Sequence, residues 1–499
     1  MKGIGKLRMT RKAASMAAAM AGVALMAACS VGPDYERPPV TVPAAYKEAT
    51  AQGGWKPGVP QDDIDRGAWW SIFNDPLLDS LERKIDVSNQ NLKAAAAAYQ
   101  QARAVVNAAR AGYFPTLGGS GSVLRSQSGI GSFSTGSAPL VSPPAQTTFD
   151  VSGDAIWELD VWGRIRRIVE SEVANAQASA ADLASARLSL QATLAADYFS
   201  LRIQDELRRL LDSTVVAYTQ ALEITQNQVV SGVAPPSDVE QAKTQLETTR
   251  SQAIAVGIFR AQLEHAIAVL IGAPPAEFSI EPVKLSATVP GIPPAVPSTL
   301  LERRPDIAAA ERRMASANAQ IGVAIAAYYP TLSLSAALSY AGPSLGNLFQ
   351  TANRVWSVGP QLAETLFDGG LRNAQVEEAR AAYDQEVALY RQTVLTGFQQ
   401  VEDQLAGLRI LAQQAEVEAA AVEAAQRAES MILNQYEAGT VAYTSVITAQ
   451  TAALANEQTA ITVLGSRLTS TVGLIQALGG GWDAASLPTA GSIGWKVFP

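Results

Sequence analysis

The sequence is poor in the side chains that carry most enzyme chemistry. Its 499 residues include one cysteine, Cys29, and one histidine, His265. One cysteine cannot form a disulfide within the chain, and one Cys with one His cannot build a zinc cluster. His265 lies in an Ala-rich stretch typical of a helix surface, and the sequence has neither a GxSxG turn nor a phosphate loop. We therefore predict no metal, no cofactor and no catalytic activity.

Long basic runs are also absent, and the net charge is −8. A protein that binds nucleic acid usually carries a basic patch, so nucleic acid is not an expected partner. Aromatic residues make up only 6% of the chain. The Ala-rich, low-aromatic composition is instead expected where helices approach one another closely.

Helix breakers are missing from the longest uniform stretch, Arg164 to Val230. Its 67 positions hold neither Gly nor Pro and are rich in strong helix formers. As one helix it would be about 100 Å long, which is too long for a globular domain. Its charges are too dense for a membrane span; they include Arg202, Asp205, Glu206, Arg208 and Arg209. We predict a long helix in water that packs sideways on similar helices.

A second stretch free of proline, Leu371 to Ala438, has the same character. Both stretches end in a glycine turn, at Gly232 and Gly439, and these glycines are 207 positions apart. The helices that follow end at Gly272 and Gly479, which have the same offset of 207. Two pairs of turns at one offset indicate a duplicated unit.

The N-terminus has the pattern of a secretory signal. Basic residues precede a short apolar run that ends at Ala28, too short and wrongly flanked for a permanent membrane span. We therefore predict a signal peptide at residues 1–28.

Cys29 follows small residues in a pattern that resembles a bacterial lipobox, so we expect it to carry lipid. The alternative is a plain signal peptide followed by a buried thiol. Residues 29–75 then form an acylated N-terminus and a Pro-rich linker.

Four segments of about 10 residues show strand-like alternation instead of a helical period. They are Leu117–Arg125, Phe149–Leu159, Thr331–Tyr340 and Val355–Leu366, the last interrupted by Pro360. Their length matches a tilted strand that crosses a bilayer, and aromatic residues lie near their ends as in an interfacial girdle. The alternative is two soluble hairpins packed on helices.

The number of strands has a consequence if they lie in a membrane. Four strands cannot close a barrel, and an open edge in lipid leaves backbone groups unpaired. Closed membrane barrels have at least about eight strands. Three chains would supply twelve, so the membrane interpretation requires a trimer.

With these parts in order, the chain resembles the TolC-like outer-membrane efflux channels, in particular the lipoprotein branch that serves RND-type pumps. The resemblance covers nearly the whole mature chain. Its motifs are GPDYERP at 32–38, WWSIFNDPLLDSL at 69–81, ELDVWGRIRR at 158–167, LLERRPDIAAAERR at 300–313 and LFDGGLR at 366–372.

The resemblance implies a homotrimer with a twelve-stranded β-barrel in the outer membrane and a long α-helical barrel below it, which forms a tunnel through the periplasm. Each chain would consist of two repeats, at 76–285 and 286–482, and a tail at 483–499. Each repeat runs helix, two strands, long helix, tip turn, helix. The implied partners are a periplasmic adaptor protein, an inner-membrane RND-type pump and outer-membrane lipid.

The resemblance also gives the two glycine turns a role. In the family these turns form the periplasmic tip, where the tunnel narrows and the adaptor docks. Gly232, Val233, Gly439 and Thr440 are therefore the candidate docking residues.

Two residues beside the turns are candidates for holding the tip closed. In a matching channel an aspartate at the position of Asp238 bonds to a tyrosine at the position of Tyr436. Asp238 also fits a helix N-terminal carboxylate favoured by the helix dipole, with Ser237 as the cap. The two interpretations are compatible.

The pore itself is expected to lack an acidic ring on the second tip helix. The family often places aspartates at two positions that are Ser445 and Thr448 here. We expect a hydroxyl-lined or apolar closure instead, with Val446 and Ile447 nearby.

These expectations describe a passive outer-membrane exit duct of a tripartite efflux pump, which exports small molecules or ions. Two alternatives are a structural or adhesive lipoprotein with a helical stalk and no pore, and the exit duct of a protein secretion system. The lipid anchor and the motif at 32–38 favour efflux.

Overall fold

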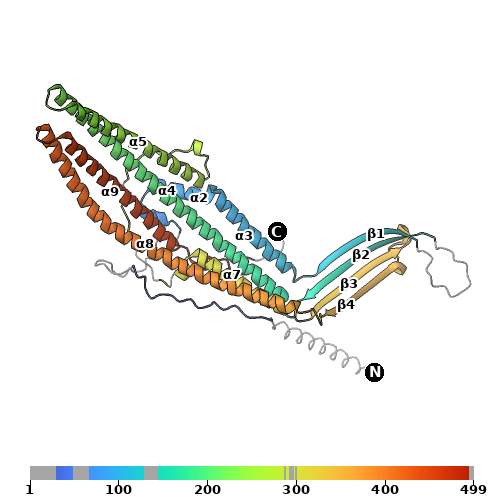
Figure 1. Cartoon of the computed structure of the whole chain (residues 1–499). Coiled ribbons are helices and arrows are strands. Elements are labelled where there is room, and N and C mark those ends of the chain that lie inside the picture. The colour runs from blue at the N-terminus through green and yellow to red at the C-terminus, as the bar shows by residue number, and fades with distance from the viewer. Residues whose placement is uncertain are drawn as a thin grey trace, which may run out of the picture.

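The computed structural model describes residues 30–48, 67–127, 144–285, 288–291, 297 and 300–493. The chain is elongated, with long helices at one end and a four-stranded sheet at the other (Figure 1). The predicted signal peptide at 1–28 and the predicted lipid site Cys29 lie outside the described residues.

The order of elements occurs twice along the chain. Short helices lead into two strands, a helix of 67 residues and a helix of 35 residues, and the same order follows again. The first set is α2 (Pro76–Ser88), α3 (Gln90–Ala111), β1 (Thr116–Ser126), β2 (Gln146–Leu159), α4 (Arg164–Val230) and α5 (Pro236–Leu270). The second is α6 (Leu300–Arg303), α7 (Pro305–Ala326), β3 (Thr331–Gly342), β4 (Arg354–Ala363), α8 (Leu371–Glu437) and α9 (Tyr443–Ala477).

The two long helices confirm the prediction drawn from the missing helix breakers, and they begin in the same way. Each follows a glycine with positive φ, Gly163 at 79° and Gly370 at 95°. An aspartate just before that glycine then accepts hydrogen bonds from the first turn. Asp160 accepts from the backbone N–H groups of residues 165 and 166 at 2.8 and 2.9 Å. Asp368 plays the same part for α8.

The helical stretch that leads into β1 is divided in two. The helical pattern from Pro76 to Gly112 has no Gly or Pro inside it, yet α2 ends at Ser88 and α3 begins at Gln90. The Asn89 side chain caps α3 by accepting from the backbone N–H of Leu92 at 2.9 Å. It also donates to the Leu270 carbonyl at the end of α5 at 2.7 Å. The break therefore rests on a contact 181 residues away, which no local pattern reveals.

The strands form one antiparallel sheet in the order β1-β2-β3-β4. The strands agree with the predicted segments within a few residues, although β4 ends at Ala363 instead of Leu366. Pro360 lies within β4 opposite Leu334. Within one chain β4 is an edge strand, so Pro360 does not interrupt its pairing with β3.

The register gives the sheet one apolar and one polar face. Side chains alternate between faces along a strand, so aligned rows share a face across all four strands. Leu117, Ala155, Ala336 and Val358 form one row, and Gly119, Gly153, Leu338 and Trp356 form another on the same side. The opposite face has rows such as Gly118, Asp154, Ala337 and Ser357, and Glu158 with Ser333 and Gln361. The first face is therefore suited to an apolar environment and the opposite face to water.

The helices pack side by side along their lengths. α4 contacts α5, α7, α3 and α9, and α8 contacts α9 and α7 (Figure 1). One buried cluster joins α2, α4, α5 and α9 through residues such as Leu81, Phe199 and Ile267. Among the described helices, one, α5, is long and apolar enough to cross a membrane by length and composition.

Candidate functional site

The two predicted tip turns lie together at the end of the helices farthest from the sheet (Figure 1). Gly232 and Gly439 adopt positive φ, at 76° and 74°. In each turn the N–H of the glycine and that of the next residue donate back to the last helical turn. The Val233 N–H reaches the Gln228 carbonyl at 2.9 Å, and the Thr440 N–H reaches that of Gln435 at 2.9 Å. This is a Schellman cap, which requires a left-handed residue and favours glycine there.

An apolar cluster holds the two tip hairpins together. Ala242 of α5 is buried with Tyr436 of α8 and with Tyr443 and Val446 of α9. The two tyrosine rings are tilted against each other with centroids 5.1 Å apart. Burial raises the pKa of Tyr443 to about 12. The cluster joins helices from both repeats, so the two turns are mechanically linked.

The predicted pair Asp238 and Tyr436 lies within this region. The Tyr436 hydroxyl is buried and makes no hydrogen bond of ordinary geometry to the described residues. Burial raises its pKa, the nearby Thr225 hydroxyl lowers it, and the Asp238 carboxylate raises it further. The carboxylate is therefore close enough to act on the phenol by charge. Asp238 lies in the first turn of α5, as a dipole-favoured carboxylate would, but the expected cap Ser237 is wrong, because the helix begins at Pro236 and no side chain caps it.

The four candidate pore residues of α9 differ in their surroundings. Val446 is 0% exposed and belongs to the apolar cluster, against which Ile447 is half-buried. Ser445 is half-buried, and Thr448 is exposed with its hydroxyl donating to the Thr444 carbonyl at 2.9 Å. Within one protomer Val446 is thus a packing residue, and Thr448 faces outward.

A polar seam that the sequence did not suggest lies farther from the turns. Gln245 of α5 donates to the Thr451 hydroxyl of α9 at 3.2 Å and approaches the Tyr218 hydroxyl of α4 at 3.5 Å. Burial raises the pKa of this tyrosine, and the carboxylates Glu429 and Glu457 raise it further. Glutamine and threonine are common on helix surfaces, so their pattern gives no signal for such a contact.

The N-terminal strap, residues 30–48, is docked along the helices and crosses from one repeat to the other. Its Val31 N–H donates to the Trp162 carbonyl at 3.1 Å, at the junction between sheet and helices. Buried Arg167 pairs with strap residue Asp34 at 2.8 Å. Farther along, Arg409 of α8 pairs with strap residue Glu48 at 2.6 Å. This part of the predicted linker at 29–75 is therefore a fixed structural element.

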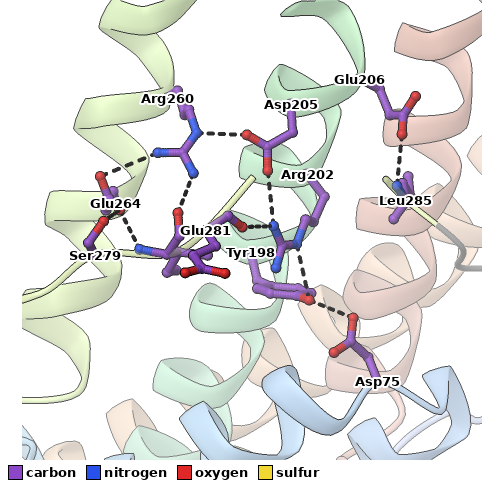
Figure 2. Close-up of polar contacts among 11 residues, drawn as sticks. Asp75, Tyr198, Arg202, Asp205, Glu206, Arg260, Glu264, Ser279, Glu281 and Leu285 are labelled. Atoms are coloured by element: carbon purple, nitrogen blue, oxygen red, sulfur yellow. Dashed lines mark hydrogen bonds and ion pairs between the residues drawn. The ribbon is translucent and has the colours of Figure 1, made fainter. Parts of the chain in front are cut away.

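A buried charge network fastens the segment after α5 to α4 (Figure 2). Asp205 accepts from Arg202 of its own helix at 3.0 Å and from Arg260 of α5 at 2.7 Å. Both guanidiniums also donate to carbonyls of that segment, those of Glu281 and Ile280, at 2.8 and 2.5 Å. From the sequence, Arg202 and Asp205 were identified only as charges that exclude a membrane span. Their pairing shows that they tie the end of the first repeat to its long helix.

Potential metal ligands do not gather in the described part of the chain. The residues placed there include no group of three or more His, Cys, Asp or Glu side chains that could hold a metal ion. His265 is exposed on α5.

The sheet has one apolar and one polar face, and it is attached to helices of 67 residues that end in a linked tip. Together these features define an outer-membrane channel with a helical tunnel. The chain belongs to the outer membrane efflux protein family, which it matches over residues 83–273 and 296–480.

Individual relatives agree with this family. The toluene efflux pump outer membrane protein TtgC of Pseudomonas putida is 31% identical over 464 residues, which cover 92% of this chain and 94% of that protein. The cation efflux system protein CusC of Escherichia coli is 29% identical over 464 residues, with 91% and 96% covered. The solved outer-membrane channel OprN is 28% identical with a TM-score of 0.82, and the match covers 91% of this chain and 100% of that one.

The predicted family, fold, outer-membrane location and role as an efflux exit duct are therefore confirmed. The family is one of channels and not of enzymes.

Proposed function

We propose that three copies of this chain form a passive duct through the outer membrane. The duct receives small molecules or ions from a periplasmic adaptor and an inner-membrane RND-type pump, and it catalyses no reaction itself. Each repeat, 76–285 and 286–482, contributes one pair of strands and one pair of packed helices, and the tail at 483–499 follows.

The two-faced open sheet carries this proposal. Its apolar rows suit lipid, while polar contacts such as Ser120 to Ser152 and Ser339 to Asp150, both at 2.7 Å, suit a watery lumen. β1 and β4 are edge strands of the described sheet. Because unpaired edges are costly in lipid, pairing of β4 with β1 of the next copy would close a barrel of twelve strands.

The apolar surface of α5 supports the same assembly. Ile254, Ile258 and Phe259 are all exposed on this helix, close to its midpoint. Large apolar surfaces of this kind mark interaction sites in soluble proteins. In the proposed trimer a neighbouring copy covers them, so α5 is a tunnel helix and not a membrane span.

The tip turns are the proposed docking site for the adaptor. Apart from their chain neighbours, Gly232 and Gly439 have no described heavy atom within 4 Å of the position that a Cβ would take, so both turns are open to a partner. Val233 and Thr440 beside them are exposed.

The residues around the tip cluster are the proposed gate. Packing of Tyr436 and Val446 would hold each chain's two hairpins together, with Asp238 acting on the phenol by charge. Ser445, Ile447 and Thr448 would then present a hydroxyl-lined or apolar constriction to the pore.

Cys29 is the proposed lipid attachment site. The strap begins at the junction of sheet and helices, because Val31 bonds there to Trp162. Lipid chains on the residue before Ser30 would enter the membrane beside the barrel, and each buried CH₂ adds about 0.8 kcal/mol of membrane affinity.

Conductance of the purified protein in a planar bilayer tests the duct. We expect discrete conductance steps, which a helical stalk without a pore would not give. Asp154→Asn, on the polar face, should reduce the preference for cations measured by reversal potential. The matched change Ala155→Ser, on the apolar face, should leave that preference unchanged. Absence of conductance steps for correctly assembled trimers of both the parent and Tyr436→Ala, which should open the tip, would refute the proposal.

A further inference from the structure

The charged residues of the sheet are divided between its two faces. The four strands hold five of them, namely Arg125, Asp150, Asp154, Glu158 and Arg354. The three carboxylates share the polar face, because Asp150 and Glu158 are each four positions from Asp154 along β2. Both arginines share the apolar face, because Arg125 is eight positions after Leu117 and Arg354 is two before Trp356. Within the strands, the only charges on the apolar face are therefore positive.

The two arginines lie at one height in the sheet. Arg125 is nine positions after Thr116, the first residue of β1, and Arg354 is nine positions before Ala363, the last residue of β4. Those ends of the strands adjoin the helices (Figure 1). Nine residues of strand are about 30 Å long, and a tilt of about 40° leaves a height of about 23 Å, close to the apolar band of about 25 Å in outer-membrane barrels. If the sheet spans the membrane as proposed above, both arginines lie at its outer surface.

The positive charge of the arginines is not balanced nearby. Both side chains are exposed and form no ion pair with another residue in the described part of the chain. Asp150 points to the opposite face, where it accepts from the Ser339 hydroxyl at 2.7 Å. The sequence between the paired strands, at 127–145 and 343–353, contains no Asp, Glu, Lys or Arg. The arginines are therefore available to an anion that comes from outside the chain.

Closure of the trimer would bring the two arginines together. β1 and β4 are opposite edges of one chain's sheet, so about 14 Å separates them within a chain. When β4 pairs with β1 of the next copy, Arg354 of one copy and Arg125 of the next lie at one height on strands about 4.8 Å apart. Two guanidiniums on one face at this spacing can hold a phosphate group between them. A trimer would have three such pairs, one at each β4–β1 junction.

The surface between each pair and the helices is apolar. Val123 of β1 and Trp356 and Val358 of β4 share the face of the arginines, and all three side chains are exposed. Trp collects at membrane–water interfaces, and arginine reaches from an apolar surface to the polar headgroups. A ligand that fits this surface has a phosphorylated head at the arginines and acyl chains along the apolar residues.

We propose that each β4–β1 junction binds one molecule of lipopolysaccharide, the phosphorylated glycolipid of the outer leaflet. Arg125 and Arg354 of adjoining copies contact a phosphate of its lipid A part, and the apolar residues contact its acyl chains. A single chain cannot form this site, because each copy supplies one arginine to each of two junctions. The proposal rests on the membrane placement and the trimer proposed above.

Native mass spectrometry of the full-length trimer in mild detergent tests the site, with added diphosphoryl lipid A or the same lipid A without its phosphates. The parent should retain up to three molecules of the diphosphoryl form and markedly fewer of the dephosphorylated form. The double change Arg125→Gln with Arg354→Gln should weaken binding of the diphosphoryl form at least about tenfold, since hydrogen bonds to a charged group are lost. Lys84→Gln with Lys93→Gln is the matched control, because it removes two exposed positive charges from α2 and α3 instead.

Mixed trimers test whether two copies share each site. Chains with Arg125→Gln and tagged chains with Arg354→Gln are expressed together, and trimers that contain both are identified by mass. Each mixed trimer has one junction with both arginines, so it should bind one molecule of diphosphoryl lipid A with the affinity of a parent site. Trimers of either variant alone have no such junction and should bind it more weakly.

Three results would overturn the proposal. Equal binding by the parent and the double variant would show that the arginines are not the site. Equal retention of the two forms of lipid A by the parent would show that the phosphates are not recognised. Mixed trimers that bind no better than either variant alone would show that the arginines are not shared between copies.

The duct can be tested separately from this lipid site. The double variant should form trimers with the conductance of the parent in a planar phospholipid bilayer, because both arginines lie on the face opposite the lumen. Loss of lipid A binding with unchanged conductance therefore concerns the lipid site, whereas a parent that neither forms trimers nor conducts would contradict the duct itself.

Discussion

Tyr436 allows the sharpest test of what closes the tip. Its side chain is only 4% exposed and packs on Tyr443, whereas its buried hydroxyl makes no ordinary hydrogen bond to the described residues. Closure by packing and closure by a link from the hydroxyl to Asp238 therefore predict different effects for Tyr436→Ala and Tyr436→Phe.

The structure sets the size of the expected effect. Removing a buried aromatic ring costs about 3–5 kcal/mol. If only about 1 kcal/mol of this distinguishes the closed from the open tip in each chain, three chains give about 3 kcal/mol, or roughly 150-fold in the ratio of the two states. Tyr436→Phe keeps the ring and removes a hydroxyl without a good partner, so its effect should be near zero.

Planar-bilayer conductance and vancomycin susceptibility of cells are the two assays. Tyr436→Ala should raise both, and Val446→Ser should act in the same direction because it places a hydroxyl in the fully buried cluster. Tyr436→Phe should match the parent, as should the controls Ser445→Ala and Thr448→Ala.

The opposite ranking would refute the packing argument. If Tyr436→Phe or the double change Asp238→Ala with Tyr436→Phe opens the pore as fully as Tyr436→Ala, a polar link closes the tip. The sequence-based pairing of Asp238 with Tyr436 would then be correct.

Four further predictions concern the strap, pH, the anchor and assembly. Arg167→Ala should release the strap to limited proteolysis, because Arg167 also donates to the Val31 and Gly32 carbonyls of the strap at 3.3 Å and each such bond contributes about 1.5–3 kcal/mol; Asp34→Ala, whose carboxylate is 92% exposed, should change little, and equal protection of both variants would contradict this. Burial, aided by Asp86, raises the pKa of Glu82 to about 9, so the folded state keeps a proton that the unfolded chain has lost at neutral pH. Urea titrations should therefore show the free energy of unfolding falling with pH by up to about 1.4 kcal/mol per unit between about pH 5 and 9, and Glu82→Gln should flatten this slope; an unchanged slope would show that another group is responsible. Mass spectrometry of the mature protein should find Cys29 carrying diacylglyceryl and acyl chains, and an unmodified Cys29 would exclude the lipid anchor. Native mass spectrometry should show a trimer, and a dominant monomer with full strand content would contradict the barrel closed by three chains.

The sequence by itself determined the elements of this protein. Absence of Gly and Pro between Arg164 and Val230 is enough to require a long helix, because nothing local interrupts the backbone bonds. The glycine turns at Gly232 and Gly439 are equally local, since a left-handed residue favours glycine. Alternation of period two located the strands, and their number required more than one chain.

Only the tertiary structure decided which residues meet. Asn89 breaks a helix because it bonds to Leu270, and Arg202 is structural because it shares the Asp205 carboxylate with Arg260 of another helix. The sequence predicted Val446 as an apolar residue near the pore. Its burial against Tyr436 and Tyr443 depends on how the two tip hairpins pack together. Local patterns record backbone preference and periodicity, whereas contacts between residues hundreds of positions apart depend on the relative placement of whole helices. In a chain of long, similar Ala-rich helices, the sequence shows clearly where each helix begins and ends. Packing then decides which helices contact one another.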